Sequence, residues 1–197
     1  MALEVTEHHI HRTRCACGKL HRSEFPSDVV ASVHYGSGVK ALAVYLTQRH
    51  MLPVARTAQL LSDLYGLPIS RGTIQTMIGE AGTLLAPTVA DIADAIARSD
   101  VAGADESGYR VAGQLNWLHT AVTTDPRVPF SNNLAEQAIR MPKVKHKIAG
   151  CFRTFSGAQA FCTIRSCLAT IQKQHFDIFP SLVQAFQGNV PQPRFAG

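Results

Sequence analysis

Hydrophobic residues between positions 39 and 99 recur with the spacing of α-helices. Val39, Leu42, Ala43 and Leu46 lie on one stripe, which predicts a helix within residues 35–51. The same spacing predicts three further helices, over residues 53–65, 71–82 and 84–99. The first half of the chain is therefore expected to be helical.

Residues with special backbone properties mark the ends of these helices. Pro53 suits a helix start, where its missing N–H is not needed, and Gly66 suits a helix end, where a left-handed residue is common. The hydroxyl of Ser70 is placed to cap the following helix. In the helix between Pro53 and Gly66, Ala58, Leu61 and Leu64 are predicted to face the core.

The pattern changes near residue 99 to the alternation that is typical of strands. We predict a β-hairpin within residues 101–123, with its turn near Gly113. After a Pro-rich loop, helical spacing returns at 133–141, 156–174 and 178–187, and Ser156 is the predicted cap of the middle helix. The expected fold is α+β and mainly helical, with the last two helices packed on the hairpin.

Positive charge is concentrated toward the C-terminus. The whole chain has a net charge of +5, whereas residues 137–197 carry eight basic residues and one acidic residue. Such a segment suits a polyanion, usually nucleic acid, although it also suits a solvated surface. The candidate DNA contacts in this segment are Arg140, Lys143, Lys145 and Lys147.

No apolar run in the sequence is long enough for a membrane span or a signal peptide. The five cysteines are an odd number, which does not suggest a secreted disulfide framework. These features predict a cytoplasmic protein with no membrane partner.

Cys15 and Cys17 lie among several histidines in the N-terminal segment, and thiolate and imidazole are zinc ligands. Zinc knuckles have two or more residues between paired cysteines, whereas only Ala16 separates these two. The alternative is a flexible arm with free thiols.

Residues 53–81 have the length of a helix–turn–helix, with two short helices joined by a turn that contains glycine. The second helix offers polar side chains that could contact phosphates or base edges. These candidate DNA contacts are Arg71, Thr73, Gln75 and Thr76. Two helices with a tight turn are also a common part of any small helical domain.

Asp105 and Glu136 are candidate ligands for divalent metal. Phosphodiester chemistry commonly uses two metal ions held by a cluster of carboxylates, and Asp105 lies among small residues at or near the end of the first predicted strand. Glu106 points to the opposite face of that strand. Glu136 has an alternative role, because with Asn133 as N-cap it occupies the third helical position of a capping box.

Four stretches of the chain together resemble one protein family. They are "RCACGKLHRSEFP", "ALAVYLTQRHMLPVARTAQLLSDLYGLPISRGTI", "ADESGYRVAGQLNWLHTAVT" and "SNNLAEQAIR". In this order they resemble a transposase of the insertion-sequence IS66 family, from about residue 11 to about residue 188. The sharpest parts are the D-E-S-G stretch followed by W-L-H and the N-N-L-A-E-Q-A-I-R helix.

The resemblance implies three regions and a metal-dependent reaction on DNA. A remnant of a zinc-finger-like segment would occupy residues 1–27, a helical region with the helix–turn–helix residues 28–98, and an incomplete ribonuclease-H-like core residues 99–197. Transposases of this kind use an Asp-Asp-Glu triad with Mg²⁺ to cleave and transfer DNA strands. Matched to this chain, the first aspartate falls on Asp105 and the glutamate on Glu136, while Cys15 and Cys17 match the zinc-finger segment.

The chain departs from the family pattern at two places. The usual CxxC pairs are reduced to C-A-C, so Zn²⁺ is not expected to bind. The middle aspartate has no counterpart, because the hairpin uses most of the residues between Asp105 and Glu136, and a parallel crossover needs a dozen or more residues. Asp125 is the sole candidate, in a Pro-flanked turn, and residues 122–133 are interpreted as a junction where an internal segment has been lost.

These considerations predict a transposase by descent that retains DNA binding and has lost catalytic competence. Its expected partners are transposon ends and a second copy of itself, with no small-molecule substrate. Two alternatives are a non-catalytic DNA-binding regulator of transposon ends and a decayed product whose incomplete core does not fold cooperatively.

Overall fold

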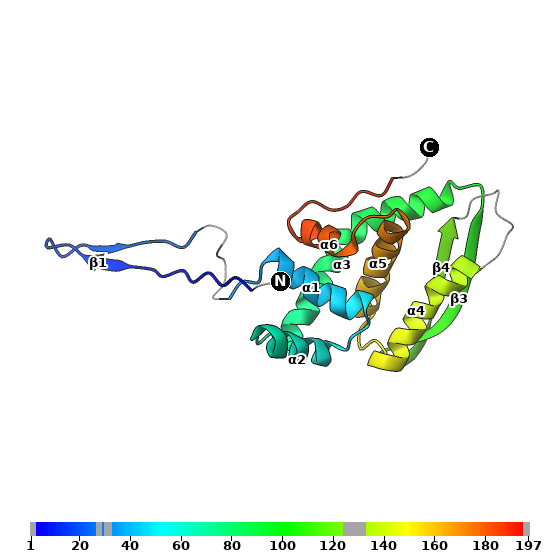
Figure 1. The fold of residues 1–197 in the computed structure, drawn as a ribbon, viewed down its shortest axis with the longest axis horizontal. Helices are drawn as coiled ribbons and strands as arrows, with labels where there is room; N and C mark the ends of the chain where they lie inside the picture. Colours follow the sequence, from blue (N-terminus) through cyan, green and yellow to red (C-terminus); the bar gives the residue numbers. More distant parts are fainter. Residues whose placement is uncertain (1–2, 27–28, 30–32, 124–132, 195–197) are drawn as a thin grey trace. The chain divides into compact units, whose positions relative to one another are not determined.

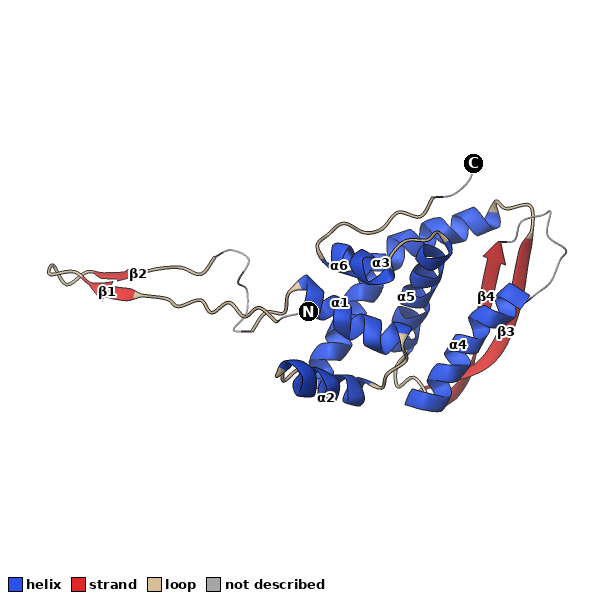
Figure 2. Ribbon diagram, viewed as in Figure 1, coloured by secondary structure: helices blue, strands red, loops and turns tan. Residues whose placement is uncertain are grey.

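The computed structural model describes residues 3–26, 29, 33–123 and 133–194. It divides into two compact units, residues 1–36 and residues 37–197. The mixed helical and β architecture agrees with the predicted α+β class (Figure 1, Figure 2). No helix in the described part of the chain is long and apolar enough to cross a membrane.

The N-terminal unit contains a small antiparallel hairpin in the segment that carries Cys15 and Cys17. Its strands are β1 (Arg12–Arg14) and β2 (Leu20–Arg22), and Arg12 is opposite Arg22. The turn between them is closed by main-chain hydrogen bonds from Cys15 to Lys19 (2.8 Å) and from Gly18 to Cys15 (2.9 Å). Gly18 has a φ of +82°, which a glycine adopts without strain. The turn therefore holds the C-A-C sequence at the tip of the hairpin.

The second unit begins with the helices predicted from residues 39–82. They are α1 (Ser37–Val44), the π-helical turn η1 (Tyr45–Arg49), α2 (Val54–Tyr65) and α3 (Arg71–Ala97). Gly66 ends α2 with a φ of 62°, and the Ser70 hydroxyl accepts a hydrogen bond from the Thr73 N–H at 3.0 Å. Both predicted boundaries are confirmed. Leu61 is buried as predicted, whereas Leu64 is 65% exposed, contrary to the prediction.

The two helices predicted at 71–82 and 84–99 form one continuous helix, α3. Its buried residues include Ile74, Ile78, Ala81, Leu85, Thr88 and Ile92. Their spacing is helical throughout, so one face of α3 packs against its neighbours without a break at residue 83. Pro87 lies inside the helix, and the long packed face outweighs the loss of one main-chain hydrogen bond.

A β-hairpin follows as predicted, formed by β3 (Ala102–Val111) and β4 (Gln114–Thr123). Tyr109 is opposite Asn116 and Asp105 is opposite Thr120. The two turn residues, Ala112 and Gly113, have φ angles of 50° and 81°, so the turn has the left-handed backbone of tight hairpins.

Three helices complete the second unit: α4 (Asn133–Ala149), α5 (Phe155–Lys173) and α6 (Ile178–Phe186). Helix α4 extends past the predicted end at residue 141, with Pro142 inside it. The N-cap of α5 is Thr154, which accepts a hydrogen bond from the Gly157 N–H at 3.1 Å. The prediction of Ser156 is therefore wrong by two residues, because Ser156 is already helical.

The packing of these helices corrects the expected arrangement. Helix α4 packs on both strands of the hairpin, whereas α5 packs mainly on α3 and α6 on α1 (Figure 1). Aromatic rings connect the hairpin with α5: Phe152 lies 5.5 Å from Tyr109 and 5.2 Å from Phe161 between ring centroids. The helical layer and the hairpin thus share one core, and Phe161 is the largest fully buried side chain among the described residues.

Two glycines of α3 give a test of the crossing between α3 and α5. A Cβ on Gly82 would lie 2.9 Å from the Cβ and 3.1 Å from the Cα of Ala160, whereas a Cβ on Gly79 would meet nothing within 4 Å. We expect Gly79→Ala to raise the free energy of unfolding by about 0.5–1 kcal/mol through helix propensity. Gly82→Ala should lower it, because overpacking against backbone costs about 1–3 kcal/mol and exceeds that gain.

Urea unfolding of the two variants beside the parent chain measures the difference. Equal stabilisation by both substitutions would show that α3 and α5 do not approach closely at this crossing.

Candidate functional site

Asp105 lies within β3 and not near its end, contrary to the prediction, on the same face as Tyr109, whose hydroxyl contacts α4. The Asp105 side chain is half-buried, and its Oδ1 accepts a hydrogen bond from the Glu106 N–H at 2.8 Å. Glu106 lies on the opposite face, as strand alternation predicts, and is exposed with its carboxylate 3.4 Å from the His119 ring. Asp105 is therefore partly sheltered, while Glu106 faces solvent.

Glu136 lies in the first turn of α4, the helix that packs on β3. The elements that carry Asp105 and Glu136 are therefore in contact, although the Glu136 side chain itself is exposed. Helix α4 already includes Asn133, so the residue that precedes the helix lies outside the described residues, as does Asp125. A carboxylate in this first turn is favoured by the helix dipole.

The residues of this site do not fit a pair of Mg²⁺ ions. In the described ranges, no group of three or more His, Cys, Asp and Glu side chains could hold a metal ion. Asp105 and Glu136 would supply two carboxylates, one of which already accepts a main-chain N–H. Two hard cations need a larger set of oxygen ligands to replace their water, so we derive no metal-dependent step at this site.

The start of α3 presents the polar side chains predicted for DNA contact. Arg71, Gln75 and Thr76 are exposed, whereas Thr73 is half-buried and its hydroxyl lies 2.8 Å from that of Ser70. The Thr76 hydroxyl donates to the Gly72 carbonyl at 3.2 Å, so it is partly engaged within the helix. Arg71 and Gln75 are the side chains of this set that are most available to a partner.

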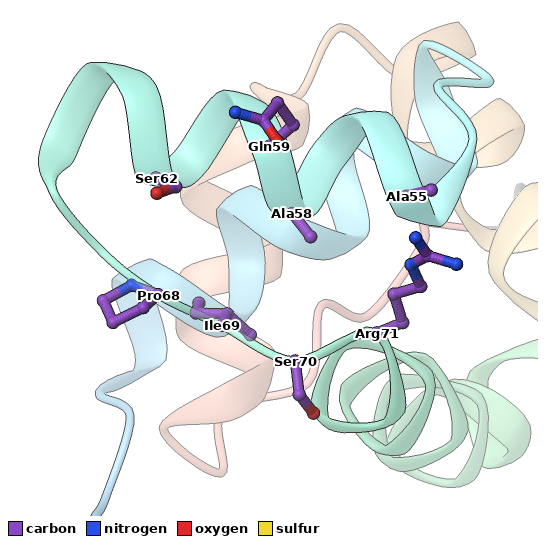
Figure 3. A pocket seen from close by; sticks show the side chains of 8 residues that line it. All are labelled: Ala55, Ala58, Gln59, Ser62, Pro68, Ile69, Ser70 and Arg71. Atoms are coloured by element: carbon purple, nitrogen blue, oxygen red, sulfur yellow. The ribbon is translucent and has the colours of Figure 1, made fainter.

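An open pocket lies between α2 and the start of α3 (Figure 3). Its volume is about 460 Å³, and Arg71 extends across it toward Ala55 at the beginning of α2. The residues that line it are Ala55, Ala58, Gln59, Ser62, Pro68, Ile69, Ser70 and Arg71. Helix α3 continues well beyond the length of a short recognition helix, so the geometry is a helix pair with a long second member.

Helix α4 carries the predicted basic residues on two different faces. Arg140, Lys143 and Lys147 are exposed and follow Glu136 at helical spacing, so they form one stripe. Lys145 instead packs over aromatic rings, with its ammonium 5.0 Å from the Phe152 centroid and 5.2 Å from the Phe161 centroid. Burial lowers the pKa of Lys145.

Cys15 and Cys17 are free and exposed at the tip of the β1–β2 hairpin. Hydrogen bonds from Cys17 lower the pKa of the Cys15 thiol, which favours the thiolate.

Tyr109 joins the hairpin to α4, a role that the sequence did not indicate. It is buried, and its hydroxyl donates a hydrogen bond to the carbonyl of Pro142. Burial raises its pKa, and the neighbouring Cys162 and Cys151 add to the increase. Strand alternation could have placed Tyr109 on the inner face, but its acceptor belongs to a helix that only the tertiary fold brings near.

Arg49 and Arg165 form a second feature that sequence reasoning missed. Burial and, to a smaller extent, the charge of Arg49 lower the pKa of Arg165 to about 10. Its Nη1 is buried and has no hydrogen-bond partner among the described residues. No local motif could have indicated this pair, because the two arginines belong to η1 and α5.

The sequence profile described as Transposase IS66 family matches the chain over residues 32–126 and 119–160. The two matched segments overlap at 119–126 and together cover more than half of the 197 residues. Comparisons with curated proteins and with solved structures found no significant match. The coverage by the family profile shows that the chain belongs to the IS66 family of transposases.

Proposed function

We propose that this chain is a transposition protein that binds DNA and does not cleave it. The family supplies the first half of the proposal, since its members act in transposition. The observation that carries the second half is the shortage of carboxylates: Asp105 and Glu136 have counterparts in the family's triad, and the middle aspartate has none.

The position of the break in the family match supports this proposal. The match divides at residues 119–126, close to the stretch at 122–133 that we interpret as a junction. Strand β4 ends at Thr123 and α4 begins at Asn133. The intervening residues are too few for a crossover to a parallel strand, which takes a dozen or more residues. An internal loss at this point would remove the remaining strands of the sheet together with the middle carboxylate.

A cleavage assay tests the loss of catalysis. We expect no nicking of end-labelled duplex DNA with transposon ends in either Mg²⁺ or Mn²⁺, because two carboxylates and water do not retain two divalent ions. Asp105→Ala is the matched control, and it should behave as the parent chain does. Metal-dependent nicking that disappears in Asp105→Ala would overturn the proposal.

DNA binding is supported by the exposed polar start of α3 and by the stripe Arg140, Lys143 and Lys147 on α4. We expect Arg71→Ala to weaken binding to duplex DNA and to reduce the slope of affinity against salt by about one phosphate contact. Arg98→Ala is the matched control, because Arg98 is also exposed and lies at the other end of α3, about 40 Å away along the helix.

Fluorescence anisotropy of labelled transposon-end DNA over a range of salt concentrations measures both quantities. A preference for the transposon ends over unrelated duplex would favour a regulator that occupies those ends. Equal effects of Arg71→Ala and Arg98→Ala would contradict an interface at the start of α3.

A further inference from the structure

The guanidinium of Arg165 lacks the partner that a buried cation normally has in a folded protein. Its Nη1 atom is buried and makes no hydrogen bond to the described residues, and none of their carboxylates forms an ion pair with it. The half-buried Lys40 ammonium, by contrast, is paired with the Glu80 carboxylate at 2.7 Å. Buried polar groups in native proteins are nearly always satisfied, so an unsatisfied one indicates a partner from outside the chain, such as an ion.

Arg49 brings a second positive charge to the same place. It is the last residue of η1, which packs on α5, and its charge contributes to the lowered pKa of Arg165. Arg49 is also half-buried, and it forms no ion pair with the described residues. Two guanidinium groups repel each other when no carboxylate lies between them, and an anion bound to both would remove that repulsion.

The backbone that carries Arg49 has an uncommon conformation. In η1 the His50 N–H donates to the Tyr45 carbonyl at 3.2 Å, which gives the wider turn of a π-helix. Met51 follows with a φ of 59°, a left-handed conformation that few residues other than glycine adopt, and its side chain is buried. π-helical turns and strained residues of this kind are frequent at functional sites. This conformation fixes the Arg49 backbone beside α5, so a ligand would bind with little ordering of the chain.

Part of each arginine side chain remains open to solvent, because both residues are half-buried. A guanidinium carries five N–H donors, and its positive charge is delocalised over the planar group. An oxyanion that bonds to the accessible donors would therefore also offset the charge at the buried Nη1 of Arg165. A phosphate group has both the negative charge and the several oxygen atoms that two arginines can share.

We propose that Arg49 and Arg165 together bind a phosphate group. The site is formed by η1 and α5, whereas the duplex contacts proposed above belong to α3 and α4. The phosphate belongs to a DNA backbone or is free in solution, and the two sources are recognised by the same chemistry. The DNA source rests on the proposed function, because the chain must then bind DNA, whereas the free source does not.

Thermal unfolding in a buffer without phosphate, repeated as inorganic phosphate is added, tests the site. Sodium chloride at the same ionic strength is the reference for each point. We expect the Tm of the parent chain to rise by about 3–6 °C at a phosphate concentration ten times the Kd, because the ligand binds only the native state. Arg165→Met should have the higher Tm before phosphate is added, and both Arg165→Met and Arg49→Met should lose this rise. Phosphate is also excluded from protein surfaces, and that general stabilisation should remain in every variant.

Arg153→Met is the matched control, because Arg153 is exposed and the substitution removes the same charge. Its response to phosphate should equal that of the parent chain. Equal responses of the parent chain and Arg165→Met would overturn the proposal, because phosphate would then act only by exclusion. A full response in Arg49→Met would overturn the shared site. An equal loss of response in Arg153→Met and Arg165→Met would also overturn it, because net charge would then explain the effect.

Fluorescence anisotropy of labelled duplex DNA distinguishes the two sources of phosphate. If the DNA backbone supplies it, Arg165→Met should reduce the slope of affinity against salt by about one phosphate contact. If affinity and slope are unchanged while the phosphate response still depends on Arg165, the site binds free phosphate. If the parent chain binds no duplex but keeps that response, the proposed function is wrong and this site stands. If the duplex binds and the response does not depend on Arg165, only the phosphate site is wrong.

Discussion

Replacing Phe161 with alanine is expected to lower the free energy of unfolding by about 3–5 kcal/mol. Phe161 is 1% exposed and is the largest fully buried side chain in the described part of the chain. Its ring contacts Phe152, which in turn contacts Tyr109 of the hairpin, and it lies beneath the Lys145 ammonium. Truncation would leave a cavity at the point where the helical layer meets the hairpin and α4, so the loss should affect the whole second unit.

Phe155→Ala is the matched control for this prediction, because both residues lie on α5 and Phe155 is 60% exposed. Its effect should stay within about 0.5 kcal/mol, as for other surface substitutions. Urea unfolding followed by circular dichroism measures both variants. If Phe161→Ala does not fold, Phe161→Leu should show the same direction with a smaller loss. Equal small effects at the two positions would contradict the packing of α5 described here.

The second large effect should have the opposite sign: Arg165→Met is expected to raise the free energy of unfolding by about 1–3 kcal/mol. The Arg165 Nη1 is buried and has no hydrogen-bond partner among the described residues, and the charge of another arginine, Arg49, also disfavours the charged guanidinium. Methionine keeps most of the apolar stem and removes the buried charge. The variant is expected to be more stable because it has no guanidinium that must lose its solvation when the protein folds.

The pKa of Arg165 gives the sign of the pH dependence. Its native pKa is lowered to about 10 from an ordinary value of 12.5, so the native state binds this proton more weakly than the unfolded state does. The deficit in stability is complete at pH values below about 10, and it decreases as the pH rises from there toward 12.5. At neutral pH the substitution should therefore have its full effect.

Arg153→Met is the matched control, because Arg153 is exposed and its removal should change stability by no more than about 0.5 kcal/mol. Thermal unfolding of the parent chain and the two variants at pH 7 measures the difference. A loss of stability in Arg165→Met would show that the guanidinium has a favourable partner.

Much of the secondary structure could be predicted because its signals are local. Pro53, Gly66 and Ser70 mark helix ends through their own backbone or hydroxyl chemistry, and the hairpin turn at Ala112 and Gly113 follows from strand alternation around a glycine. The predictions that failed depended on distant partners. Helix α3 continues through residue 83 because its buried face packs without a break against neighbouring elements. Those elements lie elsewhere in the sequence, so a short stretch around residue 83 does not reveal them.

The features of the candidate site also divide into those with a local sequence signal and those that depend on distant parts of the chain. Asp105, Glu136 and the exposed side chains of α3 could be named from their positions in recognisable stretches of sequence. The helix that packs on the strand of Asp105 could not be predicted from the sequence. The sequence pattern favoured α5 and α6, and not α4, as the partners of the hairpin. Amphipathic helices show which face they bury but not against which element, because any apolar face is a suitable partner for any other.

The sequence by itself determined the family of this protein and the types of its main elements, because each depends on which residues follow one another along the chain. Only the tertiary structure decided that α4 packs on the strand that carries Asp105, that the half-buried Arg165 lies near Arg49, and that the Tyr109 hydroxyl contacts α4. Those features join residues far apart in the chain, and their formation depends on how the helices and the hairpin fill a common core.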